Sequence, residues 1–141
     1  MELGIDTRLT LLAAGLIFLW ALVLGVWKFA QMSNSANGLA HPYVDIAHRA
    51  ALLYSFATLL LSVFVELSGW PTAVNLVAVT IVVAFFVGAI ASYVYHGFRR
   101  DTENQFHHPI ALLRPAMLAL IVGEIGGTAV LLAGFVKEQL L

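Results

Sequence analysis

The third apolar segment of the chain, residues 72–95, reads TAVNLVAVTIVVAFFVGAIASYVY and decides the fold. It contains no charged side chain, and an α-helix needs about 20 apolar residues to cross a bilayer core. The apolar run is continuous and lacks the alternation of a membrane β-barrel strand. Backbone polar groups have no water partner in lipid, so they must pair within the segment. We therefore predict a membrane-spanning helix at about residues 72–96.

Three further segments share this character and predict helices at about residues 9–30, 46–66 and 110–136. The first is too long for the apolar part of a cleaved signal peptide, which would also begin with basic residues. Glu2 and Asp6 stand there instead, and we interpret them as a solvated chain end. We expect an all-α protein, an integral membrane four-helix bundle of antiparallel up-down topology, with residues 1–141 as a single transmembrane domain.

The composition narrows the possible functions. Of the 141 residues, 61% are hydrophobic and 11% are charged, whereas a soluble domain has roughly 25% charged residues. Such a chain suits a lipid bilayer as its surroundings. Its net charge of −1 lacks the basic excess of nucleic-acid-binding proteins, so we expect no nucleic-acid partner. It has no cysteine, which excludes disulfides, thiol catalysis and iron–sulfur clusters and leaves His, carboxylate or Tyr to hold a metal.

The connections between the predicted helices differ in length and polarity. Residues 66–71, ELSGWP, contain glycine and proline and predict a tight turn, whereas residues 31–45 and 97–109 form longer polar loops. With four helices, both termini share one side of the membrane and the two longer loops share the other. The loop side has five basic residues and the terminal side has two: Lys28, Arg49, Arg99, Arg100 and Arg114, against Arg8 and Lys137. The excess of positive charge predicts that the long loops are cytoplasmic.

The histidines gather at the loop side of the predicted bundle. His41, His107 and His108 lie in polar loops, where such residues are common. His48 and His96 lie on predicted helices near the membrane interface, so they are the stronger candidates for a functional role. His48 precedes Gly69, in the tight turn, by 21 residues, and Tyr93 follows it by 24. In an antiparallel hairpin their depths then differ by only about 4.5 Å, so we expect the imidazole and the phenol to share a pocket.

Three other features are open to two interpretations. Asp45 precedes His48 by one helical turn; it either accepts the second ring N–H of His48 or caps the helix. Glu124 lies in the middle of the fourth apolar segment, where an acid is either functional or a neutral group bonded to backbone. Ala119, Gly123 and Gly127 recur every four residues, a spacing that allows close helix contact inside one bundle or between subunits.

A membrane histidine among aromatic residues, in a chain without cysteine, suits heme b held by an axial imidazole. Zinc is a weaker alternative because it requires three or four ligands close together. Only His41, Asp45 and His48 offer such a set.

At this point the pattern resembles the styrene oxide isomerase family, small four-helix membrane enzymes that bind heme b. The likeness covers about residues 8–106. The first helix, with GLIF at residues 15–18 and GVW at 25–27, is similar in sequence character to the family's first helix. The second helix opens with Ala47-His48, where the family has its axial ligand. Without a gap from His48, Tyr93 falls at the family's active-site tyrosine. Asn104-Gln105-Phe106 matches a triplet of the family's third loop.

The resemblance implies a ferric heme b, ligated through its iron by His48 near the cytoplasmic face of a bacterial inner membrane. It implies a homotrimer with heme between neighbouring subunits and a hydrophobic small-molecule substrate. The implied reaction is the redox-neutral isomerisation of an epoxide to an aldehyde by Lewis-acid catalysis at the iron. Tyr93 and Tyr54 are the catalytic candidates. The residues expected to surround the heme are His48, Asp45, Phe85 and Asn104.

The chain departs from the family at two positions of the pocket. Tyr54 stands where the family has its active-site asparagine, and Phe85 stands where it has an aspartate. Heme binding is therefore better supported than the isomerase reaction. Two alternatives stay open. One is a heme sensor or electron-transfer protein in which His48 and His96 both ligate the iron. The other is a non-heme membrane subunit or small transporter with Glu124 as its functional group.

Overall fold

The computed structural model describes residues 2–141, and within them every regular element is an α-helix. The four helices are α1 (Ile5–Asn34), α2 (Pro42–Glu66), α3 (Thr72–Arg99) and α4 (Leu113–Gln139). Each is long and apolar enough to cross a membrane. The prediction of an all-α chain with four candidate membrane-spanning helices is confirmed.

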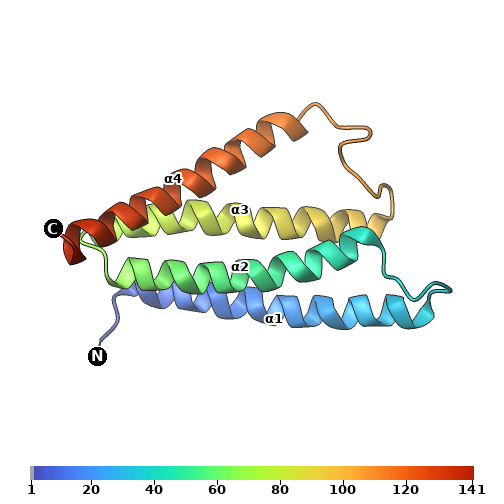
Figure 1. Ribbon diagram of the computed structural model, residues 1–141, viewed down its shortest axis with the longest axis horizontal. Coiled ribbons are helices and arrows are strands. Elements are labelled where there is room, and N and C mark those ends of the chain that lie inside the picture. The colour runs from blue at the N-terminus through green and yellow to red at the C-terminus, as the bar shows by residue number, and fades with distance from the viewer. Residues whose placement is uncertain (1) are drawn as a thin grey trace.

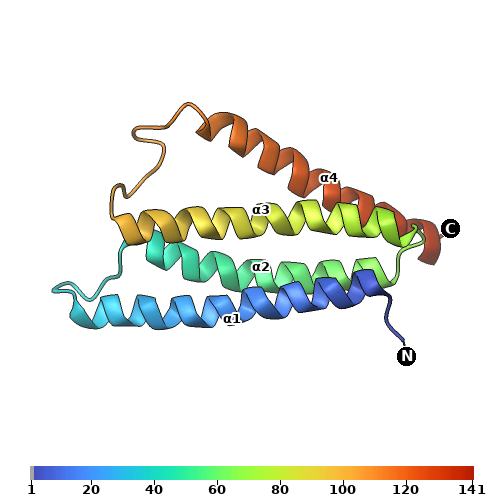
Figure 2. The same ribbon diagram turned by 180° about the vertical axis from the view of Figure 1, so that it is seen from behind.

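The helices α1, α2 and α3 lie side by side along most of their length (Figures 1 and 2). Both termini and the turn between α2 and α3 lie at one end of the molecule, and the two longer loops lie at the other. We call these the terminal end and the loop end. α4 meets α3 near the terminal end and diverges from it toward the loop end (Figure 1). The part of α4 near the terminal end is therefore the part that holds this helix to the bundle.

The first three helices run further than predicted, and the fourth is shifted along the chain. α1 begins at Ile5 and continues to Asn34, and α2 begins at Pro42, so the first loop shortens from residues 31–45 to 35–41. Pro42 favours a helix start because its φ angle is preset and it has no N–H to satisfy. The His41 side chain accepts a hydrogen bond from the Tyr43 N–H (3.2 Å). His41 is thus the N-cap of α2, and Asp45 is not.

The second long loop also differs from the prediction. α3 continues to Arg99, and α4 begins at Leu113 instead of about residue 110, so this loop covers residues 100–112. Arg100 ends α3 in the left-handed conformation (φ 52°), and its N–H donates to the His96 carbonyl (2.8 Å). Apolar runs predict which residues cross the lipid, whereas capping and turn geometry decide where the helices end.

Two clusters of buried side chains hold the bundle together. One lies where α1, α2 and α3 meet, and alanines of α1 and α2 allow close contact there: Ile17, Ala21, Leu24, Ala47, Ala51 and Ile90. The other lies toward the terminal end and includes a residue of α4: Leu61, Val65, Ala78, Val79, Val82, Phe86 and Leu131. The outward faces carry exposed apolar side chains such as Leu53 (70% exposed) and Val122 (72%), as suits contact with lipid.

The small residues of α4 pack against α3 within the chain. A Cβ atom on Gly127 would lie 2.8 Å from the backbone oxygen of Ala78, and one on Gly123 would overlap the ring of Phe85. Ala119 is exposed and takes no part in this contact. The interpretation as packing inside one bundle therefore accounts for the two glycines.

A polar cluster joins three helices at the terminal end. Asp6 is only 6% exposed, so the prediction of a solvated acid was wrong there. Its two oxygens accept hydrogen bonds from Thr7 N (3.1 Å) and Asn75 Nδ2 (3.1 Å). The Thr7 hydroxyl donates to Glu66 Oε2 (2.6 Å). The helix α1 begins at Ile5, four residues earlier than predicted, and its first turn brings Asp6 against Asn75 of α3. Asp6 is therefore buried.

We expect Asn75→Leu to lower the free energy of unfolding by about 2 kcal/mol, because the buried Asp6 carboxylate loses a hydrogen-bond donor and gains none. Unfolding of the detergent-purified protein by a graded series of denaturing detergent measures the change. Glu2→Gln is the control, since Glu2 is exposed. Equal stability of Asn75→Leu and wild type would show that the contact stabilises nothing.

Candidate functional site

His48 lies on α2 and faces α1. Its Nδ1 atom lies 2.9 Å from the carbonyl oxygen of Ala21, and because a carbonyl only accepts, the proton of the neutral ring is on Nδ1. A Cβ atom on Gly25 would lie 2.8 Å from His48 Cε1, so this glycine makes room for the ring. Nε2 makes no hydrogen bond within residues 2–141 and is not enclosed by them. In its neutral form the ring thus has an unprotonated Nε2 without a partner among residues 2–141.

Asp45 does not orient His48, which corrects one of the two interpretations of this residue. Its carboxylate forms ion pairs with Lys28 Nζ (2.6 Å) and Arg49 (2.9 Å). The pair with Lys28 links α1 to α2 one turn from the histidine, and the pair with Arg49 lies within α2. The carbonyl of Ala21 takes the orienting role instead, as backbone carbonyls often do for ligand histidines.

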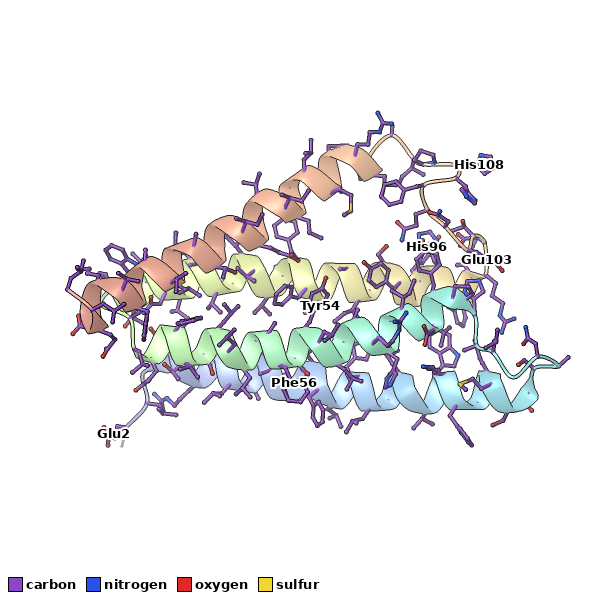
Figure 3. All side chains as sticks on the ribbon, viewed as in Figure 1. Glu2, Tyr54, Phe56, His96, Glu103 and His108 are labelled. Carbon is purple, nitrogen blue, oxygen red and sulfur yellow. The ribbon has the colours of Figure 1, made fainter. Side chains whose placement is uncertain are left out.

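The two candidate tyrosines, Tyr54 of α2 and Tyr93 of α3, lie where these two helices meet. Tyr54 stacks on Phe86 of α3 with 4.2 Å between ring centroids, and Figure 3 shows it between α2 and α3. Tyr93 stacks on Tyr43 at 6.0 Å. Neither phenol oxygen makes a hydrogen bond within residues 2–141, and neither is enclosed. Both hydroxyls are therefore free to donate, and within one subunit the contacts of His48 and those of the tyrosines lie on different helices.

Glu124 lies on α4 directly after Gly123, which packs against Phe85 of α3. Its Oε1 atom is enclosed and has no hydrogen-bond partner within residues 2–141. Nothing in the described chain bonds this oxygen to a helix backbone. Glu124 is therefore an acid with an unpaired oxygen, within residues 2–141, on the helix that packs against α3.

The remaining candidates have local partners. Phe85 lies against Gly123 of α4. Asn104 shapes the loop of residues 100–112: its side-chain oxygen accepts from Phe106 N (2.9 Å), and its N–H donates to Thr102 (3.0 Å). His41 caps α2 and Asp45 is held by two cations, so the zinc set with His48 is not assembled. Residues 2–141 bring no three potential metal-binding His, Cys, Asp or Glu side chains together.

His96 and Asp101 form a second histidine centre at the loop end. His96 Nδ1 lies 2.8 Å from Asp101 Oδ1, and Figure 3 shows His96 near the end of α3. The hydrogen bond from His96 lowers the pKa of the Asp101 carboxyl from its ordinary 3.8. The pair lines a pocket of about 230 Å³ with His108.

The lowered pKa of Asp101 predicts an acid-sensitive loop. A carboxyl whose pKa is lower in the folded state stabilises the fold above its unfolded pKa and loses that effect as the pH falls through the folded value. Between about pH 5 and about pH 3 we expect hydrogen exchange of residues 100–112, corrected for intrinsic rates, to accelerate by less than about tenfold, because the pair is exposed. Asp101→Asn should remove this acceleration. An identical response in the variant would contradict the assignment.

No protein-family model, no curated protein and no solved structure matches this chain. The residues themselves therefore carry the functional argument.

Proposed function

We propose that this protein binds heme b through His48 and isomerises a hydrophobic epoxide to an aldehyde. The observation that supports it best is the state of His48. Nδ1 is engaged by the Ala21 carbonyl, and Nε2 is unpaired and open at a half-buried, apolar position. An axial heme ligand needs an unprotonated ring nitrogen and a partner for the other one. The side chains available fit heme b: His48 supplies an imidazole, the chain has aromatic residues near it, and it has no cysteine.

Bound ferric heme would supply a Lewis acid for the epoxide oxygen. The chain's own contribution is binding and positioning. The Tyr54 and Tyr93 hydroxyls have no partner within residues 2–141, so they can donate hydrogen bonds to a substrate oxygen. Phe86, stacked on Tyr54, and Phe85 supply apolar surface that favours a hydrophobic substrate and excludes water. Phe85 and Tyr54 replace the family's acid and amide, so the preferred epoxide is expected to differ from the family's.

The separate positions of His48 and the tyrosines support heme between subunits. His48 is hydrogen-bonded to α1, whereas Tyr54 of α2 and Tyr93 of α3 stack on rings across the contact between α2 and α3. In the homotrimer that the resemblance implies, a pocket between subunits would combine His48 of one subunit with the tyrosines of the next. In this arrangement the chain is an antiparallel up-down bundle in a bacterial inner membrane, with the loops at residues 35–41 and 100–112 in the cytoplasm.

The direct test is turnover by the purified protein. We expect protein reconstituted with heme to convert an aryl epoxide, such as styrene oxide, to its aldehyde without consuming a reductant or oxidant. Tyr93→Phe should slow turnover by about 10²-fold or more, the scale of a lost positioned hydrogen-bond donor, without changing the heme spectrum. Heme-loaded protein that leaves a panel of aryl and alkyl epoxides unchanged would contradict the isomerase proposal and favour a heme sensor or electron-transfer protein.

A second experiment tests the shared site. Inactive His48→Ala and Tyr93→Phe subunits are co-expressed with different tags, and mixed oligomers are isolated through both tags. If each pocket uses residues of two subunits, mixed oligomers regain part of the wild-type activity because some interfaces contain both native residues. Mixed oligomers as inactive as the parents would place His48 and Tyr93 of each pocket in one subunit.

A non-heme function has one specific observation in its favour. Glu124 Oε1 is enclosed without a partner, and an unpaired acid inside a membrane bundle is a candidate for ion or proton transfer. Failure of the purified protein to bind added heme, together with proton flux in vesicles that Glu124→Gln abolishes, would support this alternative.

A further inference from the structure

A pocket at the loop end is not part of the heme proposal. It has a volume of about 700 Å³ and lies between the end of α1, the first loop and the end of α3. Its lining combines an aromatic ring, amides and two opposite charges, including Trp27, Gln31, Asn34, Arg100 and Glu103. Figure 3 shows Glu103 beside the end of α3. The pocket is therefore polar, roomy and placed where the apolar spans end.

The two charges in the pocket have no ion-pair partner within residues 2–141. The ion pairs within residues 2–141 are Lys28–Asp45, Arg49–Asp45 and His96–Asp101. Arg100 and Glu103 take part in none of them, although both line the same space. A guanidinium and a carboxylate that share a pocket without pairing leave room for a ligand that carries both a negative and a positive group.

The position of the two charges also fits the depth of a lipid headgroup. Arg100 is the C-cap of α3, directly after the membrane-spanning segment, and Glu103 lies three residues further into the loop. In a membrane phospholipid the phosphate lies nearer the hydrocarbon than the amine does. Trp27 adds an amphipathic ring at the same level, as is common at membrane interfaces.

We propose that this pocket binds the zwitterionic headgroup of a phosphatidylethanolamine, with the phosphate on Arg100 and the ammonium on Glu103. Arginine binds phosphate oxygens through several N–H groups at once. The primary ammonium of ethanolamine has N–H groups that Glu103 accepts, whereas the quaternary ammonium of choline has none. The site thus distinguishes phosphatidylethanolamine from phosphatidylcholine and, through Glu103, from anionic phosphatidylglycerol.

The test compares thermal unfolding of delipidated protein in nanodiscs of phosphatidylcholine alone and of phosphatidylcholine mixed with phosphatidylethanolamine or phosphatidylglycerol. We expect phosphatidylethanolamine to raise the Tm of wild type by about 3 °C or more, and phosphatidylglycerol to raise it less. Arg100→Gly and Glu103→Gln should abolish the rise. Glycine is chosen because Arg100 has a positive φ (52°) that glycine adopts without strain, so the variant folds while losing the guanidinium.

The matched control is Arg99→Gln. Arg99 is the neighbour of Arg100, lies over the ring of Tyr95 and does not line the pocket, so this variant should keep the full response. Native mass spectrometry of the same proteins provides a second measurement: retained phosphatidylethanolamine should fall in Arg100→Gly and not in Arg99→Gln. Heme binding should be unchanged in Arg100→Gly, which separates this site from His48.

Three results would overturn the proposal. An equal rise in Tm for wild type and Arg100→Gly would assign the effect to the bilayer as a whole. An equal or larger rise with phosphatidylglycerol, strengthened in Glu103→Gln, would make the pocket an anionic-lipid site. The same rise with inorganic phosphate or free phosphoethanolamine in phosphatidylcholine nanodiscs, with no further effect of the lipid, would make it a site for a soluble anion.

Discussion

His48→Ala is expected to lower heme affinity by more than the roughly 10–100-fold that loss of a supporting hydrogen bond costs, because the axial ligand itself is removed. We expect no other histidine to replace it, because His41 caps α2 and His96, paired with Asp101, lies at the loop end and not against α1. We therefore expect the Soret band of wild type to be absent in this variant, even after heme is added to the purified protein.

The measurement is an absorption spectrum of detergent-purified protein before and after reduction with dithionite. His107→Ala is the matched control, since His107 is an exposed histidine of the second long loop, and it should keep the wild-type spectrum. Gly25→Val provides an independent test of geometry. Its side chain would occupy the space of the His48 ring, so it should weaken heme binding while leaving the histidine in the sequence.

The outcomes separate the three functional hypotheses. A band lost in His48→Ala and unchanged in His96→Ala indicates one histidine ligand and an open position for an epoxide. A band whose position changes in His96→Ala indicates ligation by two histidines and a sensor or electron-transfer role. Wild type without a Soret band, even with added heme, would contradict both heme hypotheses and leave the Glu124 alternative.

The four helices were predictable from sequence because each apolar run is longer than a bilayer core requires. Their ends were less predictable, since hydropathy does not report caps. His41 and Pro42 start α2 with a side-chain acceptor and a preset φ angle, and neither signal is apolar. The burial of Asp6 was missed for the same reason: once α1 begins at Ile5, its first turn lies against α3 and Asn75.

The partner of His48 was also missed, although a signal for it exists in the sequence. Gly38 lies in the first loop, thirteen residues after Gly25 and ten residues before His48. Gly25 and His48 therefore lie at similar depth in neighbouring helices. A glycine at that depth indicates space for a large side chain across the interface. Asp45 was the predicted partner because carboxylates are common partners of histidine. The nearby cations Lys28 and Arg49 hold that carboxylate instead.

Gly127→Val is expected to detach α4 from α3 and to lower the free energy of unfolding by about 3 kcal/mol or more, the upper range for overpacking. The reason is the nature of the obstacle. A Cβ atom at this position would lie 2.8 Å from the backbone oxygen of Ala78 and closer still to Val82. A flexible side chain can rotate away, whereas a helix backbone inside a packed bundle cannot, so α4 itself must move.

Gly126→Val is the matched control for this change. Gly126 directly precedes Gly127 in the same helix, and a Cβ atom there meets nothing within 4 Å. The two substitutions therefore change helix propensity equally, but only Gly127→Val changes the packing. Trp70 provides the measurement, because its Nε1–H donates to the Val130 carbonyl of α4 (2.8 Å). With Trp20 and Trp27 replaced by phenylalanine, its fluorescence should report detachment in Gly127→Val alone. Equal stability of the two variants would mean that the α3–α4 contact does not depend on Gly127. A loss confined to Gly127→Val would show that close packing at this glycine holds α4 against α3.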